Sequence, residues 1–93
     1  MTIKASEIKT WAKSNGVPCN GDLFETKIDG INYRAEFYAE IPVGSDTPEL
    51  HLAADSYIEK QIDGVWEKVD FPQTEEGDAA FNELLSKITP TLI

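Results

Sequence analysis

Cysteine and histidine are nearly absent from this chain, which has one of each, Cys19 and His51. A single cysteine forms no internal disulfide, so the fold does not depend on an oxidising compartment. One cysteine and one histidine are too few for a structural zinc site, and a nucleophile paired with a histidine base could use only His51. The sequence also lacks an Asp-x-Asp-x-Asp-Gly calcium loop. We therefore expect no metal, no cofactor and no enzymatic activity.

Long hydrophobic runs are missing as well. No apolar stretch has the length of a membrane span, and residues 1–10 alternate polar and apolar side chains, unlike a signal peptide. The 93 residues are enough for one modest core, and we expect a single domain over 1–93. The expected location is the cytoplasm, which would be the host cytoplasm if a phage encodes the protein.

Basic residues are scarce. Seventeen acids against eight bases give a formal net charge of −9, and residues 36–83 hold thirteen acids against Lys60 and Lys68. Such a field repels nucleic acids and anionic membranes and attracts basic surfaces. The acidity is also compatible with a role in solubility alone. The sequence thus favours a basic protein surface as the partner, with no direct binding of nucleic acid or membrane.

Two segments have helical spacing. In the first, Asn15-Gly16 is suited to end a helix, and Val17-Pro18 prevents its continuation. In the second, over 74–89, Thr74 is the expected N-cap and Pro90 ends the segment. The apolar stripes of the two predicted helices are Ala5, Ile8, Trp11 and Ala12, and Phe81, Leu84, Leu85 and Ile88.

Two β-hairpins are predicted between these helices. Asp29-Gly30 suits a type I′ turn within residues 23–41, and that turn would place Ile28 opposite Ile31 and Glu25 opposite Arg34. Asp63-Gly64 predicts the same turn within 49–71, with a bulge near Leu52. The order α-β-β-β-β-α predicts an α+β two-layer sandwich, with a four-stranded antiparallel sheet and both helices on one face.

The other face of this sheet would be open to water. Its acids, seven against three bases, and its aromatic side chains favour protein binding, although aromatic residues in strands also stabilise sheets by ordinary cross-strand packing. The predicted partner-binding residues are Glu36, Tyr38, Glu40, Asp55, Tyr57, Glu59, Trp66 and Asp70.

One hypothesis of function is an acidic module that inhibits or modulates a basic protein that handles nucleic acid. Its size, acidity and lack of catalytic groups resemble in type the anti-CRISPR and anti-restriction proteins of phages and mobile elements. The alternatives are a structural subunit that forms a homodimer through sheet edges or the open face, and a small enzyme or ligand carrier.

A local resemblance concerns residues 7–16, Glu-Ile-Lys-Thr-Trp-Ala-Lys-Ser-Asn-Gly. This stretch is similar to the first helix of the DNA-binding tail of actinobacterial histone-like silencers, which ends in Trp-Ala-x-x-Asn-Gly. The resemblance implies a helix here. That family continues with an arginine-bearing loop, whereas residues 18–22 of this chain, Pro-Cys-Asn-Gly-Asp, contain no base.

Overall fold

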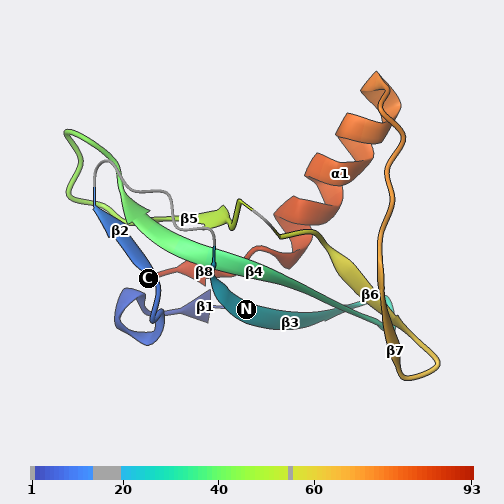
Figure 1. Cartoon of the computed structure of the whole chain (residues 1–93). Coiled ribbons are helices and arrows are strands. Elements are labelled where there is room, and N and C mark those ends of the chain that lie inside the picture. Colours follow the sequence, from blue (N-terminus) through green and yellow to red (C-terminus); the bar gives the residue numbers. More distant parts are fainter. Residues whose placement is uncertain (1, 14–19, 55) are drawn as a thin grey trace.

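The first predicted hairpin is present in the computed structural model, which describes residues 2–13, 20–54 and 56–93 (Figure 1). It consists of β3 (Asp22–Ile28) and β4 (Ile31–Ile41). The register is the predicted one, with Ile28 opposite Ile31 and Glu25 opposite Arg34. Asp29 and Gly30 have φ angles of 51° and 82°, as a type I′ turn requires.

β4 is the centre of a mixed, mostly antiparallel sheet, in which it is hydrogen-bonded to four other strands of the described chain. Along one edge, β4 pairs first with β3 and then, in parallel, with β2. Along the other edge it pairs first with β6 and then with β5, and β7 pairs with β6. The bounds of these further strands are Trp11–Lys13 for β2, Glu49–Leu52 for β5, Glu59–Ile62 for β6 and Val65–Lys68 for β7.

The second predicted hairpin is only partly continuous. Its turn is at Asp63-Gly64, and Ile62 faces Val65 as predicted. However, its first arm is divided into β5 and β6, because the chain leaves the ladder after Leu52 and rejoins it at Glu59. Within this interruption, the Ala53 N–H donates to Glu36 O, and the Ser56 hydroxyl accepts from Glu36 N–H. These two bonds satisfy the Glu36 backbone on the side of β4 where neither β5 nor β6 lies beside it.

The N-terminal helix predicted by the sequence is wrong. The segment instead consists of β1 (Thr2–Ile3), the short 3₁₀ helix η1 (Ala5–Glu7) and β2. The reason is the length of β4: β3 covers it only as far as Phe37, so the edge at residues 39–41 needs another partner. β2 supplies that partner, and β1 pairs in parallel with β8 (Thr91–Leu92) at the C-terminus (Figure 1). Asn15-Gly16 lies outside the described residues.

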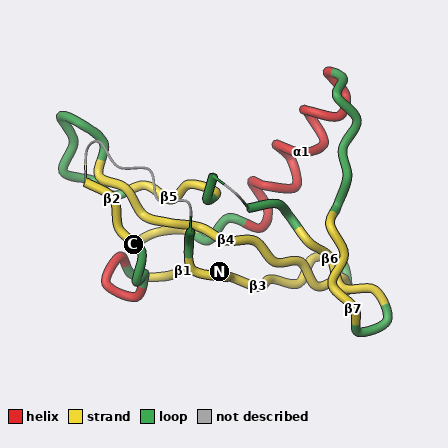
Figure 2. Tube along the Cα trace, viewed as in Figure 1, coloured by secondary structure: helices red, strands yellow, loops and turns green. Residues whose placement is uncertain are grey.

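The C-terminal helix is confirmed as α1 (Glu75–Ile88), the long helix in the described part of the chain (Figure 2). Its N-cap is Thr74, whose hydroxyl oxygen accepts from Gly77 N–H at 3.0 Å. Acidic residues in the first turn stabilise the positive end of the helix dipole. The α+β class is therefore correct, but the described residues form one long helix instead of two and more strand segments than predicted.

The two larger buried clusters lie on one side of the sheet. Odd-numbered residues of β4 point to it: Ala35 and Phe37 pack with Ile88 of α1, and Ala39 packs with Ile3 and Ile8. Since side chains alternate along a strand, α1 and the N-terminal segment cover adjoining parts of the same face. The even-numbered residues of β4 point to the opposite side. We call that side the outward face.

Candidate partner-binding face

The strand registers place a continuous set of side chains on the outward face. Arg34 is paired with Glu25 on β3 and with Glu59 on β6, and Tyr38 is paired with His51 on β5. The members on strands, all linked by such pairs, are Leu23, Glu25, Lys27, Asn32, Arg34, Glu36, Tyr38, Glu40, Glu49, His51, Glu59, Gln61, Trp66 and Lys68. The predicted set therefore shares one side of the sheet wherever it lies on a described strand, and Asp55 lies outside the described residues.

Trp66 and Glu59 are both held by Arg34. The Arg34 guanidinium lies 4.3 Å from the centre of the Trp66 ring, and its Nε donates to Glu59 Oε1 at 2.9 Å. Trp66 is half-buried as a result. These three side chains form a fixed support between β4, β6 and β7.

Tyr38 points to the outward face, but only 5% of its surface is exposed. It packs against Ala53, which the hydrogen bond to Glu36 O holds beside β4, and its ring centre lies 5.7 Å from that of His51. Burial raises the pKa of the Tyr38 phenol above its ordinary value, and the negative charge of Glu40 raises it further. Sequence alternation indicated the correct side for Tyr38 but could not show that Ala53 covers it.

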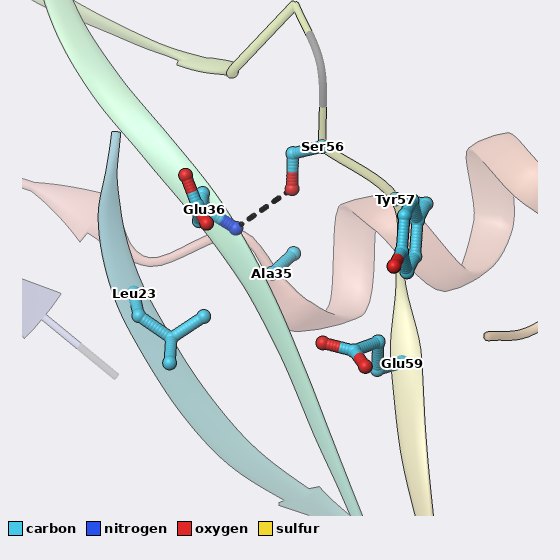
Figure 3. A pocket seen from close by; sticks show the side chains of 6 residues that line it. All are labelled: Leu23, Ala35, Glu36, Ser56, Tyr57 and Glu59. Atoms are coloured by element: carbon cyan, nitrogen blue, oxygen red, sulfur yellow. Dashed lines mark hydrogen bonds between the residues drawn. The ribbon is translucent and has the colours of Figure 1, made fainter. Parts of the chain in front are cut away.

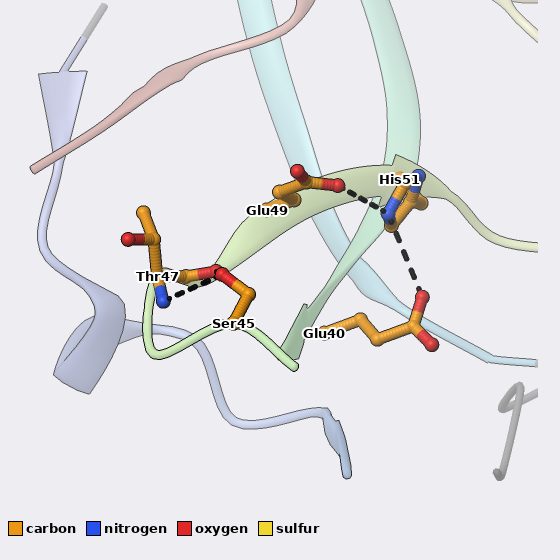
Figure 4. Close-up of polar contacts among 5 residues, drawn as sticks. All are labelled: Glu40, Ser45, Thr47, Glu49 and His51. Carbon is orange, nitrogen blue, oxygen red and sulfur yellow. Dashed lines mark hydrogen bonds and ion pairs between the residues drawn. The ribbon is translucent and has the colours of Figure 1, made fainter. Parts of the chain in front are cut away.

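Two carboxylates face each other near the end of the sheet. Glu40 and Glu49 are cross-strand partners on β4 and β5. His51 Nε2 lies 3.5 Å from Glu40 Oε2 and 3.5 Å from Glu49 Oε2 (Figure 4). The neighbouring loop is closed by Thr47 N–H, which donates to Ser45 Oγ. Like charges directly opposite each other destabilise a sheet unless a cation lies between them.

The interruption between β5 and β6 creates a recess of about 120 Å³. Its wall carries the carboxylates of Glu36 and Glu59, the hydroxyl of Ser56 and the ring of Tyr57 (Figure 3). The Glu59 carboxylate points from β6 toward β4, close to Tyr57. Glu36 Oε2 accepts from Gly21 N–H, which holds that side chain against the end of β3. The bulge expected near Leu52 marks the place where the chain leaves the ladder, but the sequence pattern did not predict that the ladder is interrupted until Glu59 or that a recess forms there.

Tyr57 is the exposed aromatic residue of the predicted set, at 49% exposure. Its ring lies 5.3 Å from Lys68 Nζ. A second, more apolar hollow of about 240 Å³ lies on the other side of Tyr57, against Phe71 and Phe81, and Asp70 is at its margin. Asp70 is exposed there, away from the Glu40–Glu49 pair.

Within residues 2–13, 20–54 and 56–93, no cluster of three or more histidine, cysteine, aspartate or glutamate side chains is arranged to hold a metal ion. The helices in that same part are all too short or too polar to cross a membrane. No protein-family model matches the sequence, and comparisons with curated proteins and with solved structures give no significant match.

Proposed function

We propose that this chain binds a basic surface of a nucleic-acid-handling protein through its outward face and thereby blocks or modulates that protein. The part that docks consists of Glu36, Glu40, Glu49 and the recess beside Tyr57. We call it the acidic half of the outward face. The corresponding biological class is that of phage or mobile-element proteins that act against host defence, such as anti-CRISPR and anti-restriction proteins.

The observation that carries this proposal is the facing pair of Glu40 and Glu49. Their placement costs stability in the free protein when His51 is neutral, because like charges are held opposite each other on adjacent strands. A cationic group from a partner would relieve that repulsion on binding. Glu49 is accessible for such a contact, since 58% of its side chain is exposed.

Segregation of charge within the face supports the same assignment. Lys27 and Arg34 lie on the part of β3 and β4 nearer the Asp29-Gly30 turn, whereas Glu40 and Glu49 lie at the other end of β4. Lys68, opposite Glu59, lies beside Tyr57 and away from that pair. Of the described residues, His51 is the basic side chain within ion-pair distance of Glu40 and Glu49. A partner would therefore meet a local excess of negative charge at the acidic half.

The recess provides a specific contact for such a partner. A guanidinium or ammonium group could enter between Glu36 and Glu59 and lie against the Tyr57 ring, where ion pairing and a cation–π contact act together. Because Arg34 already neutralises part of the Glu59 charge, Glu36 would contribute most of the attraction. The partner's lysine and arginine side chains, which normally bind phosphates, then bind the carboxylates of this chain. The partner therefore can no longer bind nucleic acid at that surface.

The first test uses a fluorescent deca-arginine peptide as a probe of basic surfaces. The test variant is Glu36→Gln/Glu40→Gln/Glu49→Gln, and the matched control, Asp29→Asn/Asp63→Asn/Glu67→Gln, removes the same charge near the hairpin turns. We expect affinity for the wild type to fall steeply between about 0.05 M and about 0.5 M salt. The test variant should bind about tenfold more weakly than the control. Equal weakening of both would show that only net charge matters and would contradict a defined site.

The second test looks for the partner itself. Wild type and test variant are used side by side to capture proteins from a cell lysate, and bound proteins are identified by mass spectrometry. We expect a basic nucleic-acid-binding protein that the variant fails to retain, and competition between this chain and nucleic acid for the purified partner. Captured proteins that bind nucleic acid and this chain simultaneously would contradict the proposed blocking.

A further inference from the structure

No strand in the described part of the chain lies along the outer edge of β3. Among the described residues, β3 pairs only with β4, and no hydrogen bond from its backbone runs to another segment. Its first residue is covered, because the Asp22 carboxylate accepts from the N–H groups of Lys9 and Thr10. Residues 23–28 remain as an edge that can pair with another strand.

The phase of the ladder shows which residues of β3 present their backbone to this edge. In a two-residue hairpin the pair flanking the turn, here Ile28 and Ile31, exchanges both backbone hydrogen bonds, and such pairs alternate along the strands. The N–H and C=O groups of Thr26 therefore point to β4, and those of Glu25 and Lys27 point outward. The bond from Ala39 N–H to Thr10 O agrees with this pattern. It shows that the backbone N–H of an odd-numbered residue of β4 points toward the edge on which β2 and β3 lie.

We propose that two copies of this chain associate by antiparallel pairing of their β3 edges about a twofold axis at Thr26. In this register Glu25 of each copy lies opposite Lys27 of the other. Both residues have outward-pointing backbone groups, so each pair exchanges two backbone hydrogen bonds, and their side chains form a complementary ion pair on the outward face. The partner is a second copy of this chain, independent of the basic protein proposed above.

Charge selects this register over its neighbour. Pairing about Glu25 would place the two Glu25 side chains opposite each other and would leave Lys27 opposite Leu23, which is disfavoured. Pairing about Thr26 replaces the like-charge contact with two contacts of opposite charge and brings two threonine side chains together on the other face. The interface is closed by its twofold symmetry, so it stops at a dimer.

The net charge of −9 on each copy opposes association. This repulsion acts over long distances, and salt screens it beyond about 8 Å at physiological ionic strength. The Glu25–Lys27 contacts are shorter than that. Salt should therefore strengthen the dimer, whereas it should weaken the complex with a basic partner. The opposite salt dependence lets the two proposals succeed or fail separately.

The test is sedimentation equilibrium of the wild type and of Glu25→Lys and Lys27→Glu at about 0.15 M and about 0.5 M salt. The controls Glu67→Lys and Lys60→Glu make the same charge changes on the β6–β7 hairpin. We expect concentration-dependent dimers for the wild type and both controls. Dimer affinity should fall by about tenfold in each β3 variant, because two favourable contacts become repulsive. A monomeric wild type at millimolar concentration would overturn the proposal.

Mixing the two β3 variants is the decisive step. The copy with Glu25→Lys carries lysine at both positions and the copy with Lys27→Glu carries glutamate at both, so the mixed dimer regains two opposite-charge contacts. We expect the mixture to associate more tightly than either variant alone; no gain on mixing would refute the register. Hydrogen exchange of the wild type gives an independent readout, since the Glu25 and Lys27 amides should become protected as concentration rises. Unchanged exchange would also refute it.

Discussion

Arg34 and Glu59 join β4 to β6 through a hydrogen-bonded ion pair, with Arg34 Nε 2.9 Å from Glu59 Oε1. The backbone ladder between these strands is short, covering Tyr33–Lys60 and Arg34–Glu59. The side-chain pair therefore supports a weakly held junction, and it also fixes one wall of the recess.

A double-mutant cycle with Arg34→Ala and Glu59→Ala should give a coupling energy of about 1 kcal/mol, at the upper end for partly exposed pairs. The two side chains are 24% and 21% exposed, which leaves the pair incompletely screened. Urea unfolding measures the coupling. The control cycle on Lys87 and Glu83, with side chains 51% and 71% exposed, should give about 0.3 kcal/mol. Equal couplings would show that the Arg34 contact has no special role.

Tyr38 should make stability depend on alkaline pH. The unfolded chain releases the phenol proton near pH 10, whereas the raised pKa in the folded protein retains it to higher pH. Above pH 10 the unfolded state therefore binds fewer protons, and the stability present below that pH is lost as pH rises through the folded pKa. Urea unfolding at pH 9 and pH 11 should show a smaller loss in Tyr38→Phe than in the wild type. Identical losses of stability in the two proteins would contradict a raised pKa of Tyr38 in the folded state.

Gly77→Ala should destabilise the protein, although alanine ordinarily favours a helix over glycine by about 1 kcal/mol. A Cβ on Gly77 would collide with the carbonyl oxygen of Pro72, whose backbone lies against the first turn of α1. We expect a loss of about 1–3 kcal/mol in the free energy of unfolding. The exposed residue Ala80 provides the comparison, since Ala80→Gly should cost only the propensity difference. A more stable Gly77→Ala protein would exclude the close approach.

Ile3→Ala tests the corrected N-terminal segment. Ile3 is not part of the apolar stripe predicted for a helix, yet it is 7% exposed and packs with Ile8, Ala39 and Leu92. Its truncation should cost about 2–4 kcal/mol in thermal or urea unfolding. The same truncation at Ile31, which is 42% exposed at a hairpin turn, should cost less than about 1 kcal/mol. Similar losses at both positions would argue against the burial of Ile3 against Ala39 and Leu92.

The two hairpin turns and α1 could be predicted because their signals are local. A type I′ turn requires positive φ at both central residues, which favours Asp-Gly, and the two-residue turn then sets the register of the hairpin. The N-cap Thr74 and the apolar spacing from Phe81 to Ile88 define the helix. The N-terminal segment could not be predicted in this way. Its spacing fits a helix, but its β-branched residues also fit strands. The choice between the two depends on the end of β4, which β3 leaves without a partner strand along one edge, and the residues of the N-terminal segment give no sign of that.

Local patterns in the chain account for its acidity, the two turns, the C-terminal helix and the alternation that directs Glu36, Glu40 and Glu59 to one side. Contacts between distant segments set the environment of the outward face: Ala53 covers Tyr38, Arg34 holds Glu59 and Trp66, and the gap between β5 and β6 forms the recess. The two kinds of feature differ in the range of the interactions that produce them. Turn geometry and alternation depend on neighbouring residues, whereas burial and ion pairing depend on segments that meet only when the chain has folded.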